Sequence, residues 1–186
     1  KRIVGIDVAR ALAIIGMIIV NFKIAIGSEG MDSLKSIMGL LDGKAAATFV
    51  VLAGIGIAFM SNASIKNNDA LKLKKVQFSL FKRAIFLFVI GLLFFPIWPA
   101  DILHFYGIYM LLTLVLLASR KRIILAVALI LILIYPLMML TWEYNVGWNF
   151  DTLEYANFWS VGGFFRNLFY NGFHPVIPWA AFMLIG

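Results

Sequence analysis

Charged and amide side chains interrupt the first long apolar stretch of the chain, which runs from Arg2 to Lys23 and contains Asp7, Arg10 and Asn21. An ionisable group at membrane depth is costly unless it is paired or lines a wet cavity, so such groups are candidates for function. On a helix, steps of three and four residues lead from Asp7 through Arg10 to Asn21, which places them on one face. The stretch is therefore predicted to form a spanning helix with one polar stripe.

The pair Asp7 and Arg10 permits two interpretations. Residues three apart on a helix can form an ion pair, which lowers the cost of burying each charge. The pair is then structural, with Arg10 reaching toward the inner interface. Alternatively, the guanidinium presents a fork of donors that suits phosphate, so Arg10, with Asp7 beside it, is a candidate cofactor-binding site for an anion.

Asp101 and His104 have the same spacing at the start of a later apolar stretch. The carboxylate can orient the imidazole, and a histidine held in this way can act as general base for a hydroxyl or amine acceptor. The alternative is an interfacial ion pair that faces lipid headgroups. Asp101 and His104 are accordingly candidate catalytic residues.

The second histidine, His174, is followed by Pro175, Pro178 and Trp179. Two prolines so close together predict a stiff and irregular backbone, which is tolerated at membrane depth where it is buried or lines a cavity. His174 is therefore a third catalytic candidate. The alternative is an aromatic anchor at the membrane interface with an incidental histidine.

Composition limits the class of protein that can position these groups. Hydrophobic residues make up 63% of the chain, charged residues make up 13%, and the mean hydropathy is +0.97, which excludes a soluble domain. The net charge of +7 arises from clusters beside apolar runs, so nucleic acid is not expected as a partner. The chain has no cysteine and two histidines, so we expect no metal and no thiol nucleophile.

Hydropathy predicts an all-α, polytopic transmembrane helical bundle that forms a single domain over residues 1–186. The approximate spans are 3–26, 44–61, 78–98, 101–118, 123–142 and, as a partial span, 174–186. The last segment is short and the chain does not begin with Met, so we expect a part of a larger bundle. The lysines between Lys66 and Lys75 are assigned to a polar loop, and residues 143–173 to an aromatic segment at the interface.

Small residues predict where these helices approach one another. Gly5, Ala9 and Ala13 lie four residues apart in the first span, and Gly54 and Gly56 lie in the second. Such spacing lets two helix backbones come close. We therefore expect each of these two helices to pack tightly against a neighbouring helix at its small residues.

The distribution of basic residues predicts the orientation of the bundle. Eleven Lys and Arg residues fall at the amino end and in the second and fourth loops, with the adjacent Lys82 and Arg83, against four in the other loops. Cytoplasmic loops carry the excess of Lys and Arg. The amino end, with Asp7 and Arg10, is therefore expected on the cytoplasmic side, and Asn21, with both histidines, toward the outer side.

Four stretches together resemble a known family. RIVGIDVARALAIIGMIIVNF resembles the opening helix of the transmembrane acyltransferases typified by heparan-alpha-glucosaminide N-acetyltransferase and the bacterial YeiB-type membrane proteins. Arg2, Asp7, Arg10 and Asn21 match that motif, and Ala11 replaces the usual glycine. The other three stretches are residues 42–59 (DGKAAATFVVLAGIGIAF), 100–112 (ADILHFYGIYMLL) and 171–186 (NGFHPVIPWAAFMLIG).

The resemblance implies that an acyl group, acetyl in the first instance, passes from cytoplasmic acyl-CoA to an acceptor on the far side. Asn21 matches an asparagine that lines the catalytic centre of the lysosomal enzyme. The catalytic histidine of that enzyme lies in the loop after this helix, whereas the loop from Lys23 to Gly43 contains no histidine here. Either His104 or His174 then supplies the base from another helix.

We therefore expect an integral protein of the bacterial cytoplasmic (inner) membrane that acts as an acyl-CoA-dependent acyltransferase. Its expected partners are the lipid bilayer, acyl-CoA (acetyl-CoA) and a glycan or other envelope acceptor, with a homodimer left open. Two alternatives remain at this point. One is a membrane transporter for a small anionic or sugar-like solute, which should show an internal repeat of spans with broken helices. The other is a non-catalytic membrane protein.

Overall fold

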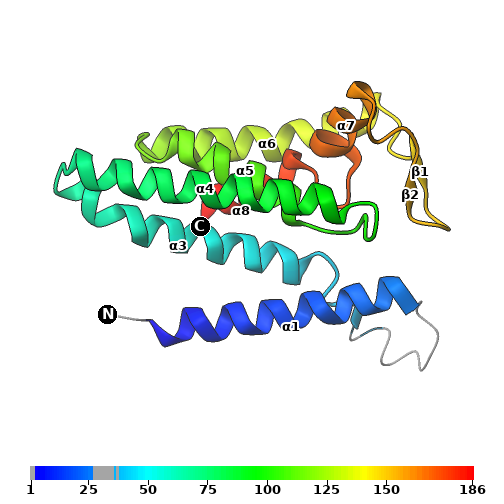
Figure 1. The fold of residues 1–186 in the computed structure, drawn as a ribbon, viewed down its shortest axis with the longest axis horizontal. Coiled ribbons are helices and arrows are strands. Elements are labelled where there is room, and N and C mark those ends of the chain that lie inside the picture. Colours follow the sequence, from blue (N-terminus) through cyan, green and yellow to red (C-terminus); the bar gives the residue numbers. More distant parts are fainter. Residues whose placement is uncertain (1–2, 27–35, 37) are drawn as a thin grey trace.

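A computed structural model describes residues 3–26, 36 and 38–186 of the chain. Long helices lie side by side along its longest axis (Figure 1). In chain order, the elements are α1 (Val4–Ile26), α3 (Lys44–Lys66), α4 (Ala70–Phe94), α5 (Leu103–Leu116), α6 (Lys121–Thr141), β1 (Trp148–Asn149), β2 (Glu154–Tyr155), α7 (Val161–Arg166), the π-helix η1 (Asn167–Asn171) and α8 (Val176–Ile185). The predicted all-α helical bundle is confirmed.

The short helix α8 lies at the centre of the bundle. It packs against α3, α5 and α6, and Figure 1 shows it among these helices. Its side chains Ala180 and Ala181 are fully buried, and Met183 is nearly so. Because small residues face its neighbours, three longer helices can surround α8 closely. The segment that carries His174 therefore enters the middle of the bundle.

Four of the described helices are long and apolar enough to cross a membrane, namely α1, α3, α4 and α6. The segments Val161–Asn171 and Val176–Ile185 form a fifth candidate, bent by 46° at the break between them. Large apolar side chains on α1 and α6 are exposed, and few residues of either helix are buried. Exposed apolar faces of this extent fit a lipid environment. The chain is an integral membrane protein.

Three helices differ from the predicted spans. Helix α3 continues five residues beyond its predicted end, to Lys66. Helix α4 begins at Ala70, eight residues before the predicted boundary, so the lysines after Asp69 lie on a helix and not in a loop. Asp69 accepts a hydrogen bond from the backbone N–H of Lys72, at 2.9 Å, and caps this extension. Helix α5 has 14 residues, or about 21 Å at 1.5 Å per residue, which is shorter than a full span.

Glycines set the closest helix contacts. A Cβ atom on Gly91 of α4 would lie 2.2 Å from the backbone N of His104 in α5, and one on Gly54 of α3 would lie 2.1 Å from the carbonyl oxygen of Met183 in α8. The close contact predicted at Gly54 is confirmed. Helix α1 agrees with the prediction at Ala13, which is buried, and differs at Gly5, where nothing lies within 4 Å of a Cβ. A Cβ on Gly16, which was not in the predicted set, would lie 2.9 Å from Ala45.

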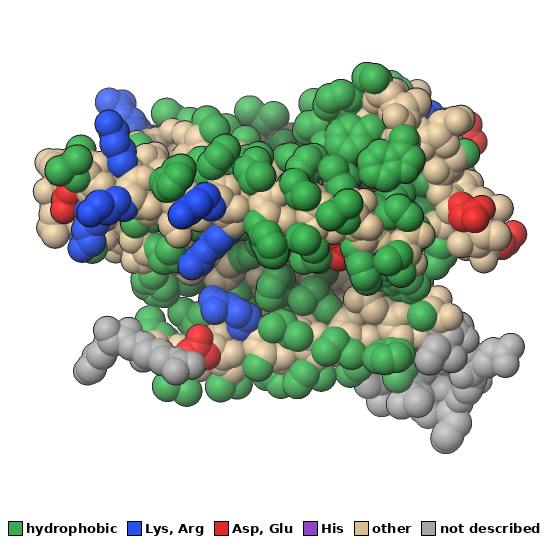
Figure 2. Space-filling model, in the orientation of Figure 1, with side chains coloured by type: hydrophobic (Ala, Val, Ile, Leu, Met, Phe, Trp, Pro, Cys, Tyr) green, Lys and Arg blue, Asp and Glu red, His purple; other side chains and the backbone are tan. Residues whose placement is uncertain are grey.

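The predicted aromatic segment folds into a compact cap at one end of the bundle. Strands β1 and β2 pair antiparallel, with Trp148 opposite Tyr155. Helix α7 follows, and the π-helix η1 leads to the break before α8. Figure 2 shows that the lysines and arginines visible on one face gather toward the opposite end, where α3 turns into α4. On this face, positive charge is therefore concentrated at one end of the long axis of the bundle.

Candidate active site

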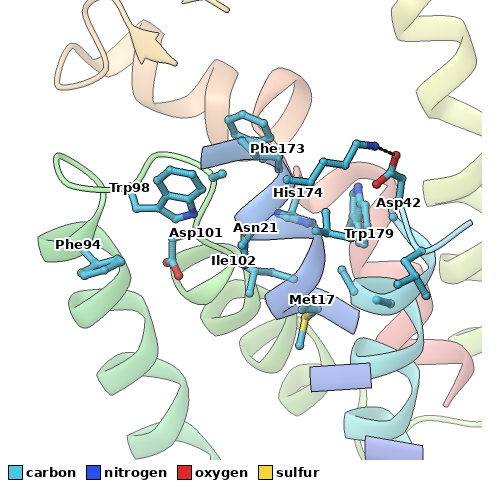
Figure 3. Close-up of a pocket in the computed structure, with 18 residues that line it drawn as sticks. Met17, Asn21, Asp42, Phe94, Trp98, Asp101, Ile102, Phe173, His174 and Trp179 are labelled. Carbon is cyan, nitrogen blue, oxygen red and sulfur yellow. Dashed lines mark hydrogen bonds and ion pairs between the residues drawn. The ribbon is translucent and has the colours of Figure 1, made fainter. Parts of the chain in front are cut away.

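A cavity of about 490 Å³ opens at the end of the bundle where α1 ends and α8 begins. Figure 3 shows its labelled side chains around a common space. Three predicted site residues line it, namely Asn21, Asp101 and His174. They come from α1, from the turn between α4 and α5, and from the break before α8. The fold therefore brings together side chains that are up to 153 positions apart in the sequence.

Asn21 reaches the cavity from the last two turns of α1. Helix α1 packs against α3, with Ala13 and Gly16 buried at the contact. Val20 follows Gly16 by four residues and Asn21 follows Met17 by four, and Met17, Val20 and Asn21 all line the cavity. An amide here can donate a hydrogen bond to a group held in the cavity.

His174 lies in the non-helical break between η1 and α8. Pro175 precedes α8, and Ile177 has φ −100° and ψ 116°, so the irregular backbone predicted from the two prolines is confirmed. The imidazole ring lies edge-on to Trp179, with 4.6 Å between ring centroids. Its Nδ1 atom is buried and has no hydrogen-bond partner within the described part of the chain. The ring therefore lies at the cavity wall without a described group that orients it through Nδ1.

His104 is placed differently from His174. It is fully buried in the first turn of α5, and its ring contacts Phe95 and Phe105. The Nδ1 atom lies 3.9 Å from Oδ2 of Asp101, so the two predicted partners are neighbours without a hydrogen bond. Oδ2 instead accepts a hydrogen bond from the backbone N–H of Leu103, at 2.8 Å. His104 is not among the residues that line the cavity.

Asp7 and Arg10 lie away from this cavity, nearer the amino end of α1. Nη1 of Arg10 is 3.9 Å from Oδ1 of Asp7, and both side chains are about one-third exposed (39% and 35%). A Cβ on Gly56 of α3 would lie 3.5 Å from Nη2 of Arg10, so the guanidinium lies against α3. The predicted polar stripe is therefore present, with Arg10 about 16 Å and Asp7 about 21 Å from Asn21 along the helix.

The structure adds site residues that sequence reasoning missed. Lys23 and Asp42 form an ion pair of 2.5 Å at the wall of the cavity, which Figure 3 shows as a dashed line. Trp98 and Trp179 add aromatic surface from two different elements. A lysine and an aspartate separated by 19 positions in the sequence carry no local signal. Trp98 had one, because Pro99 follows it at the end of a predicted span, and Trp179 was predicted with His174 as an aromatic anchor and not as a cavity residue.

The cavity offers an amide, two carboxylates, an imidazole, an ammonium and aromatic walls. These groups can hold a polar acceptor and move its proton, and aromatic faces suit the apolar face of a sugar ring. Among the described residues, no group of three or more histidine, aspartate and glutamate side chains is arranged to hold a metal ion.

Comparisons with known proteins agree with the motifs. A family model described as heparan-alpha-glucosaminide N-acetyltransferase, catalytic, matches residues 2–186. Comparisons with curated proteins and with solved structures gave no significant match. The family match covers α1 with its Asp7–Arg10 pair as well as the break that carries His174. The chain therefore belongs to the heparan-alpha-glucosaminide N-acetyltransferase catalytic family.

Proposed function

We propose that this protein is a membrane acyltransferase that moves an acetyl group from acetyl-CoA to an acceptor bound in the cavity. The observation that carries the proposal is that Asn21, Asp101 and His174 line one cavity in a chain of this family. Acyl transfer needs a base for the acceptor and a donor for the oxyanion. The cavity holds one side chain suited to each of these tasks.

His174 is the proposed base. The nitrogen or oxygen of the acceptor attacks the thioester carbonyl carbon, its proton passes to the imidazole of His174, the carbon–sulfur bond breaks, and the coenzyme A thiolate takes up the proton as it leaves. Asn21 donates a hydrogen bond to the carbonyl oxygen as negative charge develops there. Since the chain has no cysteine, transfer is either direct or proceeds through an acyl-histidine.

Asp101 is the proposed acceptor-binding carboxylate. Its side chain lines the cavity, and it has no hydrogen bond to His104 that would commit it to that residue. His104 acts in this scheme as a buried neighbour of the site. It stays the second candidate for the base, because the imidazole is one helical turn from a cavity-lining carboxylate.

Arg10 is the proposed site for a phosphate of acyl-CoA, with Asp7 holding its guanidinium. Both side chains are partly exposed at the surface of the bundle, so an anion can reach them. The distance of about 16 Å along α1 to Asn21 suits a long donor that has its phosphates at one end and its thioester at the other. No metal takes part in the proposed reaction.

The amino end is proposed to face the cytoplasm, in the inner membrane of a bacterium. The support is the gathering of basic side chains at the end of the bundle opposite the cavity (Figure 2). The donor would then bind on the cytoplasmic side, and the acceptor, a glycan or another envelope component, on the outer side. Pairing of two copies through the exposed apolar faces of α1 or α6 is left as a proposal.

The test is acetyl transfer across a membrane by the full-length protein in proteoliposomes. Acetyl-CoA labelled in the acetyl group is supplied on the side of the amino end, and an amino sugar on the other. We expect labelled N-acetyl product on the acceptor side only when both substrates are present. Acetyl-CoA that stays intact under these conditions would contradict the proposal.

One observation favours transport as the second candidate function. The segment from Val161 to Ile185 is broken at residues 172–175 and bent by 46°, and broken helices form the binding sites of many transporters. In the same proteoliposomes, a transporter would accumulate the labelled sugar in unmodified form without acetyl-CoA. An acyltransferase would not.

A further inference from the structure

The backbone around His174 is held by hydrogen bonds from aromatic side chains of three different segments. Trp148 donates from its indole N–H to the carbonyl oxygen of Asn171, at 2.5 Å, and the hydroxyl of Tyr144 donates to that of Gly172, at 3.4 Å. The hydroxyl of Tyr109 donates to the carbonyl oxygen of His174 itself. The N–H of Gly172 still closes the π-helix by donating to the carbonyl oxygen of Asn167, at 2.9 Å. The carbonyl groups on the far side of this bond are held by side chains from outside the break.

Tyr109 is the member of this set that lies deepest. It is fully buried on α5, 65 residues before His174, and belongs to the main apolar core of the bundle. Its own backbone is anchored in the helix, where Thr113 donates to the Tyr109 carbonyl oxygen at 2.8 Å. The hydroxyl therefore stands on a rigid element and points at one backbone atom of the loop.

The side chain of His174 has no hydrogen-bonding partner of the usual kind. A catalytic histidine is ordinarily oriented by a carboxylate or carbonyl that accepts from its second nitrogen. Here Nδ1 is buried without a partner among the described residues. Ring contacts with Trp179 and, at 6.4 Å, with Phe105 limit the tilt of the imidazole but do not fix the backbone from which it extends. The backbone bond from Tyr109 supplies that constraint.

We propose that Tyr109 is a positioning residue for His174, acting through the hydrogen bond from its hydroxyl to the His174 carbonyl oxygen. The proposal rests on the proposed function, in which His174 is the base. Misplacement of a reacting group by about 1 Å can cost as much as 100-fold in rate. Tyr109→Phe keeps the ring and its packing and removes only the donor, so kcat should fall about 10- to 100-fold with KM for acetyl-CoA unchanged.

The two histidines allow a test that does not depend on activity. In the full-length protein, diethyl pyrocarbonate should modify His174 at the cavity wall, while the fully buried His104 stays protected. Mass spectrometry gives the rate of modification at each histidine. In Tyr109→Phe, we expect the rate at His174 to change several-fold while His104 stays protected. Tyr135→Phe is the matched control, because it also removes a tyrosine hydroxyl, from a residue on α6 whose ring contacts Tyr170. It should leave the modification rates of both histidines unchanged.

Two outcomes would overturn the proposal. An unchanged rate at His174 would show that the hydroxyl does not position it, and modification of both histidines would show that Tyr109 only stabilises the bundle. If Tyr109→Phe does not accumulate in membranes, fluorotyrosine at position 109 changes the donor strength alone, and the same two rates decide. A wild-type protein without acetyl transfer would refute the proposed function and leave these rates as evidence on the hydrogen bond.

Discussion

Nδ1 of His104, in the first turn of α5, and Oδ2 of Asp101, in the turn before this helix, are 3.9 Å apart, which is too far for a hydrogen bond. The carboxylate bonds instead to the backbone N–H of Leu103. As a result, neither ring nitrogen of His104 has a hydrogen-bond partner in the part of the chain that the structure describes. A buried polar group left in this state lowers stability.

Replacing His104 by leucine should therefore stabilise the protein. The variant His104→Leu removes two unpaired polar atoms from an aromatic environment, and we expect the free energy of unfolding to rise by about 1 kcal/mol. Asn171→Leu is the matched comparison, because Asn171 is equally buried but bonds to Tyr155 and to two backbone carbonyls. The free energy of unfolding of Asn171→Leu should be about 3 kcal/mol lower than that of the wild type. Thermal unfolding in detergent measures both, and a destabilised His104→Leu would contradict the account.

The contact between α4 and α5 should not tolerate a methyl group at position 91. In Gly91→Ala the new Cβ would lie 2.2 Å from the backbone N of His104, so the two helices must separate. We expect a loss of about 3 kcal/mol in unfolding free energy. Gly5→Ala is the control, because nothing lies within 4 Å of that position and alanine favours the helix. Equal melting temperatures for the two variants would refute the predicted contact.

Arg10 should contribute to the affinity for acetyl-CoA. Loss of a charge-assisted hydrogen bond to phosphate costs about 1.5–3 kcal/mol, so Arg10→Ala should weaken binding about tenfold or more. Arg10→Lys keeps the charge but loses the forked set of donors. Its affinity for acetyl-CoA should therefore lie between those of the wild type and of Arg10→Ala. Isothermal titration with acetyl-CoA measures this. Lys82→Ala is a control on α4, where the ammonium lies over the Phe78 ring; a similar loss there would indicate nonspecific attraction.

Alkaline pH should loosen the aromatic cap. Burial raises the pKa of Tyr155 above its ordinary value of 10.0, and the neighbouring Arg166 offsets this in part. A group with a raised pKa in the folded state stabilises the fold below its unfolded pKa and loses this contribution as pH rises through the folded value. The melting temperature should therefore fall more steeply above about pH 10 in the wild type than in Tyr155→Phe. If the melting temperatures of the wild type and of Tyr155→Phe fall in parallel with pH, the raised pKa of Tyr155 is contradicted.

The sequence predicted the elements better than the contacts between them. Long apolar runs define α1, α3, α4 and α6, because hydrophobicity over about 20 residues is a local property. The start of α4 was missed, since charged residues after Asp69 read as a loop although they are good helix formers. Of the small residues predicted to meet a partner in α1, Ala13 is buried and Gly5 is not in contact, while the close approach at Gly16 was not predicted, because small-residue spacing does not say which small residues meet a partner.

The site was predicted as a set of residues and not as a geometry. Asn21, Asp101 and His174 were singled out by polarity within apolar segments, and all three line the cavity. His104 was predicted from its spacing to Asp101, yet it is buried in the core. Which histidine reaches the cavity depends on the rotation of α5 about its axis, which is set by tertiary packing. The prolines predict the break before α8, but they do not predict the position of His174 at the cavity wall. The pair of Lys23 and Asp42 is equally nonlocal.

The central claim is that His174, and not His104, accepts the proton from the acceptor in the cavity. The most direct measurement is single-turnover acetyl transfer from acetyl-CoA to an amino sugar by the full-length His174→Gln and His104→Gln variants, with melting temperature recorded for each. Removal of a general base costs about 100- to 10,000-fold. The account predicts a loss of this size for His174→Gln and a rate within about tenfold of wild type for His104→Gln. Undiminished transfer in His174→Gln would contradict it.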